Sequence, residues 1–374
     1  MMTARRMVLG GLLLALSLAT APMPAAAPAS GIPHRLADRE FWRLIDELSE
    51  PEGYFNSDNL VSNEDTYQEV IPELVRTVAP GGVYVGVGPD QNFTYIAAVR
   101  PAMAFIPDVR RGNLQLHLMY KALFALSATR AEFLSRLFSR PIPAGLASDA
   151  TARELMEAFA AGTADPARFD ANVRAVLDYL ARHRRSALED ADRAGIEFVH
   201  GSFFSAGPDI TFISNAGFRR ARYPAWSTLL AATDRDGVAR SFLASEALFA
   251  RVKALHERNM IVPLVGDFAG AMTIEAIGAW VREHDARVTV FYTSNVEQYL
   301  FQDQAWDRFR RSVASMPLDA TSTFIRSCFN SCSTPGGPRA VSLLDSMTGL
   351  LDAAANGRVS SYWDVLVHSR APGP

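Results

Sequence analysis

One segment in the first third of the chain constrains the fold more than any other. The run at 82–86 (GVYVG) combines β-branched and aromatic residues, ends in glycine and precedes an apparent helix over 93–99. A second apolar run at 103–107 leads directly to Asp108. Strand, glycine turn, helix, strand and acidic residue in this order are typical of the first half of a nucleotide-binding sheet. The pattern therefore predicts a Rossmann-like α/β fold, doubly wound around a mostly parallel sheet.

The α/β alternation is interrupted after Asp108 and returns later in the chain. After a first helix expected at 41–48, helical patterns fill 114–126, 130–138, 152–160, 169–183, a stretch from 189 onward, and 242–256, with a loop-rich stretch at 215–236. We then expect strands at 260–265, 287–292, 323–326 and 362–367, with helices at 272–283 and 343–354. These patterns divide the chain into a first half of the core at 30–112, a helical insertion or cap at 113–257, and a second half of the core at 258–374.

The first 29 residues resemble a signal peptide. Arg5 and Arg6 precede an apolar run at 7–19, and small residues and prolines continue to Ser30. The arginine pair fits twin-arginine export, and the general secretion route stays open as the alternative. Neither this run nor a later one has the length of a membrane-spanning helix. We expect a soluble periplasmic or secreted protein with no stable membrane insertion.

Charge and cysteine content exclude several classes of partner. The net charge is −3, with 37 basic and 40 acidic residues interspersed, which disfavours nucleic-acid binding. Cys328 and Cys332 could form one local disulfide in an oxidising compartment or remain free thiols. Two thiols without a nearby histidine pair do not make a closed zinc site, so no metal is expected. The oligomeric state does not follow from the sequence.

Polar and glycine residues follow each predicted strand of the core. Ligands of doubly wound sheets bind outside these carboxyl ends, so the expected partner is a small molecule. Asp108 stands 22 residues after Gly86, a spacing suited to binding ribose hydroxyls. Asn92 stands near the third glycine of a dinucleotide motif, which favours a nucleoside over a pyrophosphate. The predicted cofactor-binding residues are Gly86, Gly88, Pro89, Gln91, Asn92, Asp108, Gly266, Asp267, Ser294 and Asn295.

Five residues are candidates for a general base or another chemical role: Asp58, Glu64, His117, Glu297 and Tyr299. The first two belong to a polar, aromatic-bearing loop at 54–64 ahead of the glycine loop. For each of the five, a structural role in a turn, a helix terminus or the surface is the alternative. No Gly-x-Ser-x-Gly or His-Glu-x-x-His motif indicates a familiar hydrolase.

The segment 82–113, together with Gly266 and Asp267, resembles class I S-adenosylmethionine-dependent methyltransferases. In turn, Gly86 and Gly88 match their glycine loop, Asp108 their acidic ribose ligand and Asp267 their adenine contact. The acidic residue that often precedes the first glycine is absent, since Val83, Tyr84 and Val85 stand there.

The whole mature chain is also similar to a poorly characterised bacterial exported family with that fold. The strings carrying this likeness lie at 57–64, 86–95 (GVGPDQNFTY), 116–123, 265–268, 294–300 (SNVEQYL) and 323–326. The resemblance implies a pocket for S-adenosylmethionine and methylation of a small molecule. Because that cofactor is made in the cytoplasm, an exported non-catalytic binding protein and an enzyme of different chemistry on the same scaffold stay open.

Overall fold

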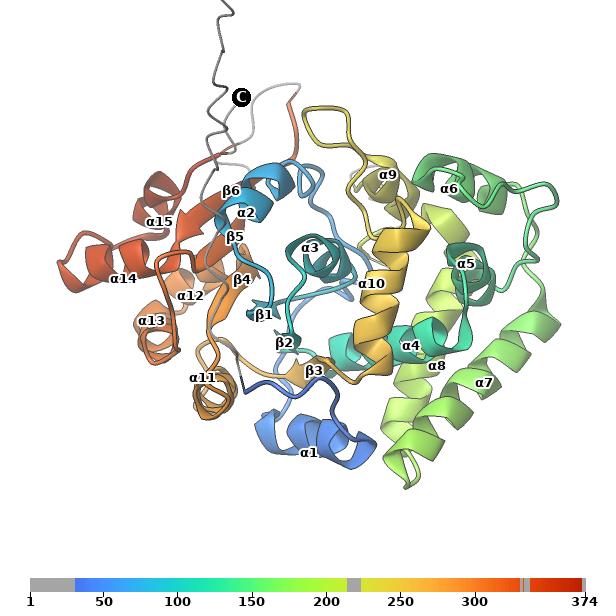
Figure 1. Ribbon diagram of the computed structural model, residues 1–374, viewed down its shortest axis with the longest axis horizontal. Coiled ribbons are helices and arrows are strands. Elements are labelled where there is room, and N and C mark those ends of the chain that lie inside the picture. The colour runs from blue at the N-terminus through green and yellow to red at the C-terminus, as the bar shows by residue number, and fades with distance from the viewer. Residues whose placement is uncertain (1–30, 214–222, 330–331, 333–336, 372–374) are drawn as a thin grey trace, which may run out of the picture.

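A six-stranded sheet lies at the centre of the protein (Figure 1). The computed structural model describes residues 31–213, 223–329, 332 and 337–371, so the expected signal peptide at 1–29 lies outside the described residues. The strand order is β3-β2-β1-β4-β5-β6, and all neighbours are parallel except β5 and β6. The strands are β1 (Val83–Gly86), β2 (Met103–Asp108), β3 (Ile261–Val265), β4 (Val288–Ser294), β5 (Thr323–Phe329) and β6 (Ala340–Ser346). This arrangement confirms the Rossmann-like α/β fold.

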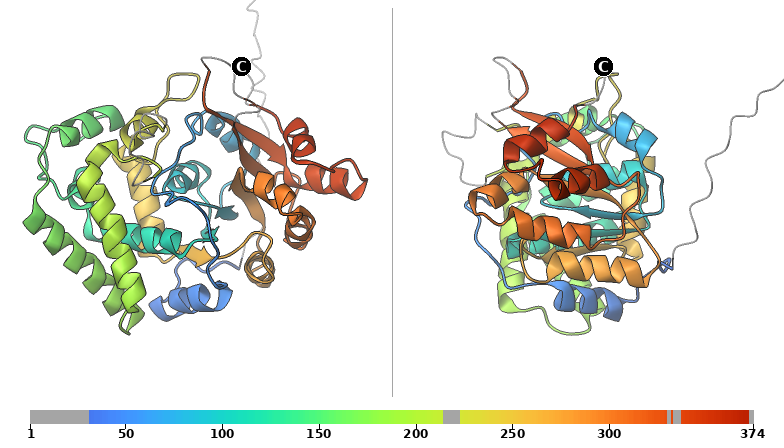
Figure 2. Two further views of the ribbon diagram at one scale, coloured as in Figure 1. Left: turned by 180° about the vertical axis from the view of Figure 1, so that it is seen from behind. Right: turned by 90° about the vertical axis from the view of Figure 1, so that its left-hand side faces the viewer.

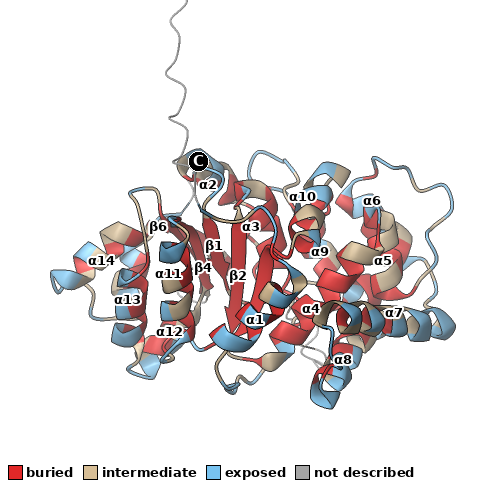
Figure 3. Ribbon diagram, turned by 60° about the horizontal axis from the view of Figure 1, so that its bottom comes forward, coloured by how far each residue is buried: buried red, intermediate tan, exposed pale blue. Residues whose placement is uncertain are grey.

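The inner strands are buried on both faces, as their continuous apolar runs predict. Every residue of β1, β2 and β3 is buried (Figure 3). Val85 in β1 pairs with Phe105 on one side and Phe291 on the other. From β1 the chain builds the sheet outward through β2 and β3, and then returns to place β4 on the opposite side of β1. The order therefore reverses between β1 and β4, where sheets of this kind form a crevice.

Helices cover both faces of the sheet. On one face α1 (Asp38–Leu48) packs on β3, and α11 (Thr273–Glu283) packs on β2 and on α13 (Trp306–Ala314). The other face carries α2 (Ile71–Thr77), α3 (Gln91–Val99), α4 (Arg111–Leu126) and α10 (Glu246–Glu257). The remaining helices of the C-terminal half are α12 (Val296–Gln302), α14 (Met347–Ala355) and α15 (Tyr362–His368). The site residues thus project from a core of three layers.

The chain between β2 and β3 is helical and extends beyond the β3 edge of the sheet (Figure 1). Besides α4 and α10 it contains α5 (Arg130–Phe138), α6 (Ala152–Ala160), α7 (Pro166–Arg184), α8 (Asp190–Ala206) and α9 (Trp226–Ala231). Aromatic rings join this part to the core, since Phe93 of α3 packs edge-on against Phe124 of α4 at 5.5 Å. Most of the expected helices lie within a few residues of their predicted bounds.

The C-terminal prediction is wrong in two places. The stretch at 343–354, expected as one helix, begins within strand β6, and α14 starts only at Met347. The stretch at 362–367, expected as a strand, is helix α15. A capping box between Ser361 and Asp364 starts this helix, and short apolar runs cannot be assigned by periodicity alone. The loop-rich stretch at 215–236 also contains a short helix, α9.

Three further features bear on the expectations about membranes, metals and cysteines. None of the described helices is long and apolar enough to cross a membrane. Within the described ranges, no group of three or more His, Cys, Asp and Glu side chains could hold a metal ion. Cys328, in β5, and Cys332 form a disulfide.

Candidate functional site

Residues 49–66 form an extended strap that crosses the carboxyl edge of the sheet, seen as the blue segment that rises from α1 in Figure 2, left. Its hydrogen bonds run along this edge from β3 to β6. Near β3 and β2, the strap amides of Glu50 and Gly53 donate to the carbonyls of Val265 and Val109, each at 2.9 Å. At β6, the Asp65 carboxylate of the strap accepts from the amides of Arg339 (2.8 Å) and Ala340 (2.9 Å). The strap therefore occupies the edge at which ligands of such sheets bind.

Glu64 lies at the centre of the strap, at the point where the strand order reverses. It is 1% exposed. Its Oε1 accepts hydrogen bonds from the Tyr292 hydroxyl (2.8 Å) and from Ser294 Oγ (2.5 Å), both at the end of β4. Its Oε2 accepts one from Gln91 Nε2 in α3 (2.7 Å). Three predicted site residues, Glu64, Gln91 and Ser294, thus meet in one buried network.

The side chain of Asn92 fixes the glycine loop after β1 by hydrogen bonds to its carbonyl groups. This buried side chain donates from Nδ2 to the carbonyls of Val87 (2.9 Å), Gly88 (3.1 Å) and Pro89 (2.8 Å). A Cβ at Gly86 would lie 2.1 Å from the Asn92 Oδ1, so glycine is required there by interior packing. Gly88 has φ +80°, the left-handed region that favours glycine. Apart from Gly88 and its two chain neighbours, no described residue has an atom within 4 Å of the position that a Cβ would take at Gly88.

His117 positions the same loop from α4. It is 1% exposed, and its Nε2 donates to the carbonyl of Gly88 at 2.8 Å, because a carbonyl can only accept. Burial lowers the pKa of His117 to about 4, so the ring is neutral at pH 7. Phe93 packs edge-on against it at 5.4 Å. The contacts of His117 are those of a positioning residue.

Asp90, which follows the glycine loop, is a buried carboxyl that the sequence did not single out. It is 3% exposed, and its Oδ2 accepts a hydrogen bond from the Trp226 indole at 2.7 Å. Its Oδ1 has no partner among the described residues. Burial raises the pKa of Asp90 to about 7, against the lowering effect of the indole. In sequence, an Asp just ahead of a helix signals an N-cap, yet its side chain makes no cap bond.

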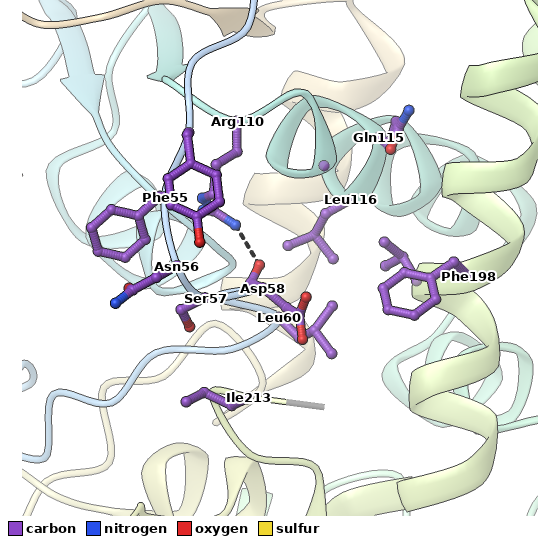
Figure 4. A pocket seen from close by; sticks show the side chains of 13 residues that line it. Phe55, Asn56, Ser57, Asp58, Leu60, Arg110, Gln115, Leu116, Phe198 and Ile213 are labelled. Atoms are coloured by element: carbon purple, nitrogen blue, oxygen red, sulfur yellow. Dashed lines mark hydrogen bonds between the residues drawn. The ribbon is translucent and has the colours of Figure 1, made fainter. Parts of the chain in front are cut away.

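Asp108 is paired with Arg110 within the chain. Its Oδ1 accepts from the Arg110 amide (2.9 Å) and its Oδ2 from the Arg110 guanidinium (2.8 Å). The guanidinium also donates to the backbone oxygen of Asp58 in the strap, the dashed line in Figure 4. Both side chains are largely buried. The carboxylate expected to bind ribose therefore has each oxygen engaged by Arg110.

The loop after β3 is likewise satisfied by the strap. The Glu50 carboxylate accepts from the amide of Asp267 in the loop (3.1 Å) and from the amide of Met272, the residue that precedes α11 (2.8 Å). The Asp267 side chain is exposed and accepts from a backbone amide two residues further on. A Cβ at Gly266 would lie 2.5 Å from the Thr273 side chain, so interior packing requires glycine at this position too.

Glu297 and Tyr299 have different environments on α12. Glu297 is 1% exposed and forms an ion pair with Arg326, which in turn bonds Asp345 at 2.7 Å. Tyr299 is 38% exposed, and its ring packs edge-on against Phe55 of the strap. Glu297 therefore has a structural partner, while Tyr299 faces the strap.

Asn295 and Ser294 complete the edge at β4. Asn295 precedes α12 without making a side-chain cap bond, and Ser294 Oγ lies 3.4 Å from its Oδ1. Ser294 has φ +52°, a left-handed conformation uncommon for serine, at the end of β4. The two residues join α12 to the Glu64 network.

A cavity of about 300 Å³ opens between the strap, the start of α4 and the helix α8 (Figure 4). Its aromatic rim is exposed, with Tyr54 at 88% and Phe198 at 53%. Among the predicted catalytic residues, Asp58 lines it. The described residues around it are Tyr54, Phe55, Asn56, Ser57, Asp58, Leu60, Arg110, Gly112, Gln115, Leu116, Phe198, Val199 and Ile213.

Comparison with known proteins gives a family and no activity. A family model described as a domain of unknown function (DUF7790) matches residues 59–336. The matched range includes β1 to β5, the helical segment between β2 and β3, and the glycine loop. No curated protein matches the chain.

Proposed function

The chain belongs to the DUF7790 family, and we propose that it binds a small molecule of the nucleoside type, S-adenosylmethionine being the first candidate. The cavity beside the end of β2 carries this proposal. It lies along the carboxyl edge at which doubly wound sheets bind ligands. Its volume of about 300 Å³ is at the small end of the range for small-molecule sites.

The chemistry of the cavity supports a ligand with a flat apolar part and a polar part. Phe55, Phe198 and Leu116 offer aromatic and apolar surface for a base, and Ser57 and the Arg110 guanidinium offer hydrogen-bonding groups. The resemblance of the glycine loop and Asp108 to those of methyltransferases also supports S-adenosylmethionine as the first candidate. Because Arg110 engages Asp108, a ribose could reach that carboxylate only if Arg110 moved.

Methyl transfer to a small molecule is the activity that this likeness favours. Bound S-adenosylmethionine would supply a methyl group on a sulfonium that needs no further activation. The protein would then have to orient the acceptor and, for some acceptors, hold a proton. Asp58 lines the cavity, and Tyr299 packs against the lining residue Phe55, which supports these two as the candidates for that role.

A binding protein without turnover is the second candidate. It is favoured because two candidates for a base have structural partners: His117 is neutral and bonds the glycine loop, and Glu297 is ion-paired inside the core. An exported protein would also meet little S-adenosylmethionine. The disulfide between Cys328 and Cys332 supports the periplasmic or secreted location from which this difficulty arises.

Calorimetric titration and thermal shift of the purified, processed protein test the proposal with S-adenosylmethionine, S-adenosylhomocysteine and adenosine. We expect saturable heat and a raised Tm with at least one of them. Gly112→Leu should abolish binding, because Gly112 lines the cavity and, apart from its chain neighbours and the nearby backbone of α4, no described atom lies within 4 Å of its Cβ position. Gly112→Ala is the matched control, since it makes the same helix-favouring change with little added volume. Absence of binding by all three compounds would refute the proposal.

A further inference from the structure

Ser294 lies at the point where the chain turns from the central sheet into a helix. It ends β4, and only Asn295 separates it from α12. Its φ of +52° lies in the left-handed region, and residues held in such a costly conformation cluster at active sites. The register of β4 against β5 also shifts between Tyr292 and Ser294, an irregularity of the kind that redirects a side chain. The backbone therefore holds the Ser294 hydroxyl in a strained position at the carboxyl edge.

The carboxylate of Glu64 lies within reach as a base for this hydroxyl. Ser294 Oγ donates to Glu64 Oε1 at 2.5 Å. The carboxylate is oriented by the Tyr292 hydroxyl at the same oxygen (2.8 Å) and by Gln91 Nε2 at the other (2.7 Å). All three donors are uncharged, and no basic side chain of the described residues pairs with Glu64, so no ion pair is broken when it takes up a proton. A nucleophile bonded to a base that further groups orient is the arrangement of covalent catalysis.

The serine is accessible, whereas its base is shielded from water. Ser294 is half-buried, and Glu64 is 1% exposed. Beside the serine, Asn295 Oδ1 lies 3.4 Å from Ser294 Oγ, and Asn295 Nδ2 donates to no acceptor of the described residues. An amide donor next to a nucleophile stabilises the oxyanion that forms when a carbonyl group is attacked. A nucleophile, a base and an oxyanion donor thus meet at one place.

The sequence around Ser294 explains why no hydrolase motif marks it. The Gly-x-Ser-x-Gly motif places a serine on a strained turn between a strand and a helix. Ser294 has this placement, but Tyr292 and Val296 stand where the motif has glycines. The arrangement is therefore visible only in the structure.

We propose that Ser294 is a nucleophile toward small esters, with Glu64 as its general base and Asn295 as its oxyanion donor. A bond forms between Ser294 Oγ and the acyl carbon, and the bond from that carbon to the alcohol oxygen breaks. The hydroxyl proton passes to Glu64 and then to the departing alcohol. Water next attacks the acyl group and gives one proton to Glu64, which returns it to Oγ as the acid leaves. This activity goes beyond the proposed function and does not depend on a ligand in the cavity.

Covalent labelling with diisopropyl fluorophosphate tests the inference on the unaltered protein. Oγ should bond to phosphorus with release of fluoride, and peptide mass spectrometry should locate the label on Ser294. The protein should also hydrolyse p-nitrophenyl acetate. Ser294→Gly should abolish both reactions, and glycine accepts a φ of +52° without strain. The matched control is Ser202→Ala, which removes a half-buried hydroxyl that donates to the Phe198 carbonyl at 2.9 Å, and it should leave both reactions unchanged.

Two further variants test the roles of the neighbouring groups. Glu64→Gln keeps an oxygen in place but takes up no proton, so labelling should slow by about 100-fold or more. Asn295→Ala should slow it by about 100-fold through loss of the oxyanion donor. Thermal unfolding checks that each variant is folded, and should Glu64→Gln not fold, the label on Ser294 and the rate of Asn295→Ala decide.

Three results would overturn the inference. They are no label, a label that persists in Ser294→Gly, and an unchanged labelling rate in folded Asn295→Ala. A labelled Ser294 together with no binding of any nucleoside would refute the proposed function alone. Nucleoside binding without a label would refute the nucleophile alone.

Discussion

Replacement of Asp90 by asparagine should raise the free energy of unfolding relative to the parent chain at pH 8. The gain at pH 5 should be smaller. The carboxyl is 3% exposed, and burial raises its pKa from 3.8 to about 7. Because one pKa unit corresponds to about 1.4 kcal/mol, this shift amounts to about 4 kcal/mol, of which about 3 kcal/mol falls between pH 5 and 7. The asparagine side chain would keep an oxygen for the Trp226 indole and carry no charge.

The sign follows from which state holds the proton. Between pH 3.8 and 7 the folded protein retains a proton on Asp90 that the unfolded chain has released, so this group's contribution to stability falls as the pH rises through that window. Above pH 7 the loss is complete, and the asparagine variant avoids it.

Urea unfolding of both proteins at pH 5 and pH 8 measures the effect. The variant should gain up to about 3 kcal/mol relative to the parent between the two conditions, with other titrating groups cancelling in the comparison. Asp307→Asn, which alters an exposed carboxyl, is the control and should show a difference within about 1 kcal/mol at both pH values. A difference for Asp90→Asn that is the same at pH 5 and pH 8 would refute the reasoning.

Three further outcomes are expected from other buried groups. Gly86→Ala should destabilise the fold by about 1–3 kcal/mol in urea unfolding, because a Cβ would lie 2.1 Å from a buried amide oxygen. Arg326→Met should cost about 3–5 kcal/mol by leaving Glu297 buried without its cation, and a cost below about 1 kcal/mol would contradict this account. Burial lowers the pKa of both His117 and His200 to about 4. The Tm should therefore fall as the pH drops from 6.5 toward 4, because the unfolded chain binds protons that the folded protein does not. Replacing both histidines by glutamine should reduce this fall.

The core of the sheet could be predicted because its signals are local. The run at 82–86 and the run at 103–107 are continuous, apolar and bounded by glycine or an acidic residue, and parallel strands buried on both faces require such runs. The stretch at 362–367 is equally apolar but short. There the capping box at Ser361 stabilises the first turn of a helix, and this local signal prevails over the strand preference of the β-branched residues.

The site could be predicted only in its parts. Glycine, acidic and amide residues were expected along the carboxyl edge, and Glu64, Gln91 and Ser294 do lie together there. The sequence carried no sign that Asp108 would be paired with Arg110 two residues later, or that Asp90 would be buried against Trp226. The second pairing depends on a tertiary contact, because Trp226 lies 136 residues after Asp90.

The strap has a consequence for the order in which the molecule is assembled. Glu64 is 228 residues from Tyr292, and Asp65 is 275 residues from Ala340, so these contacts close very long loops. Such contacts form late, because their entropic cost is repaid only when the partner strands exist. A chain still emerging from the ribosome has its glycine loop and most of its helices long before the edge above them is covered. The edge at which we propose a ligand binds is therefore covered only late in synthesis, when β6 secures the strap that was made near the beginning.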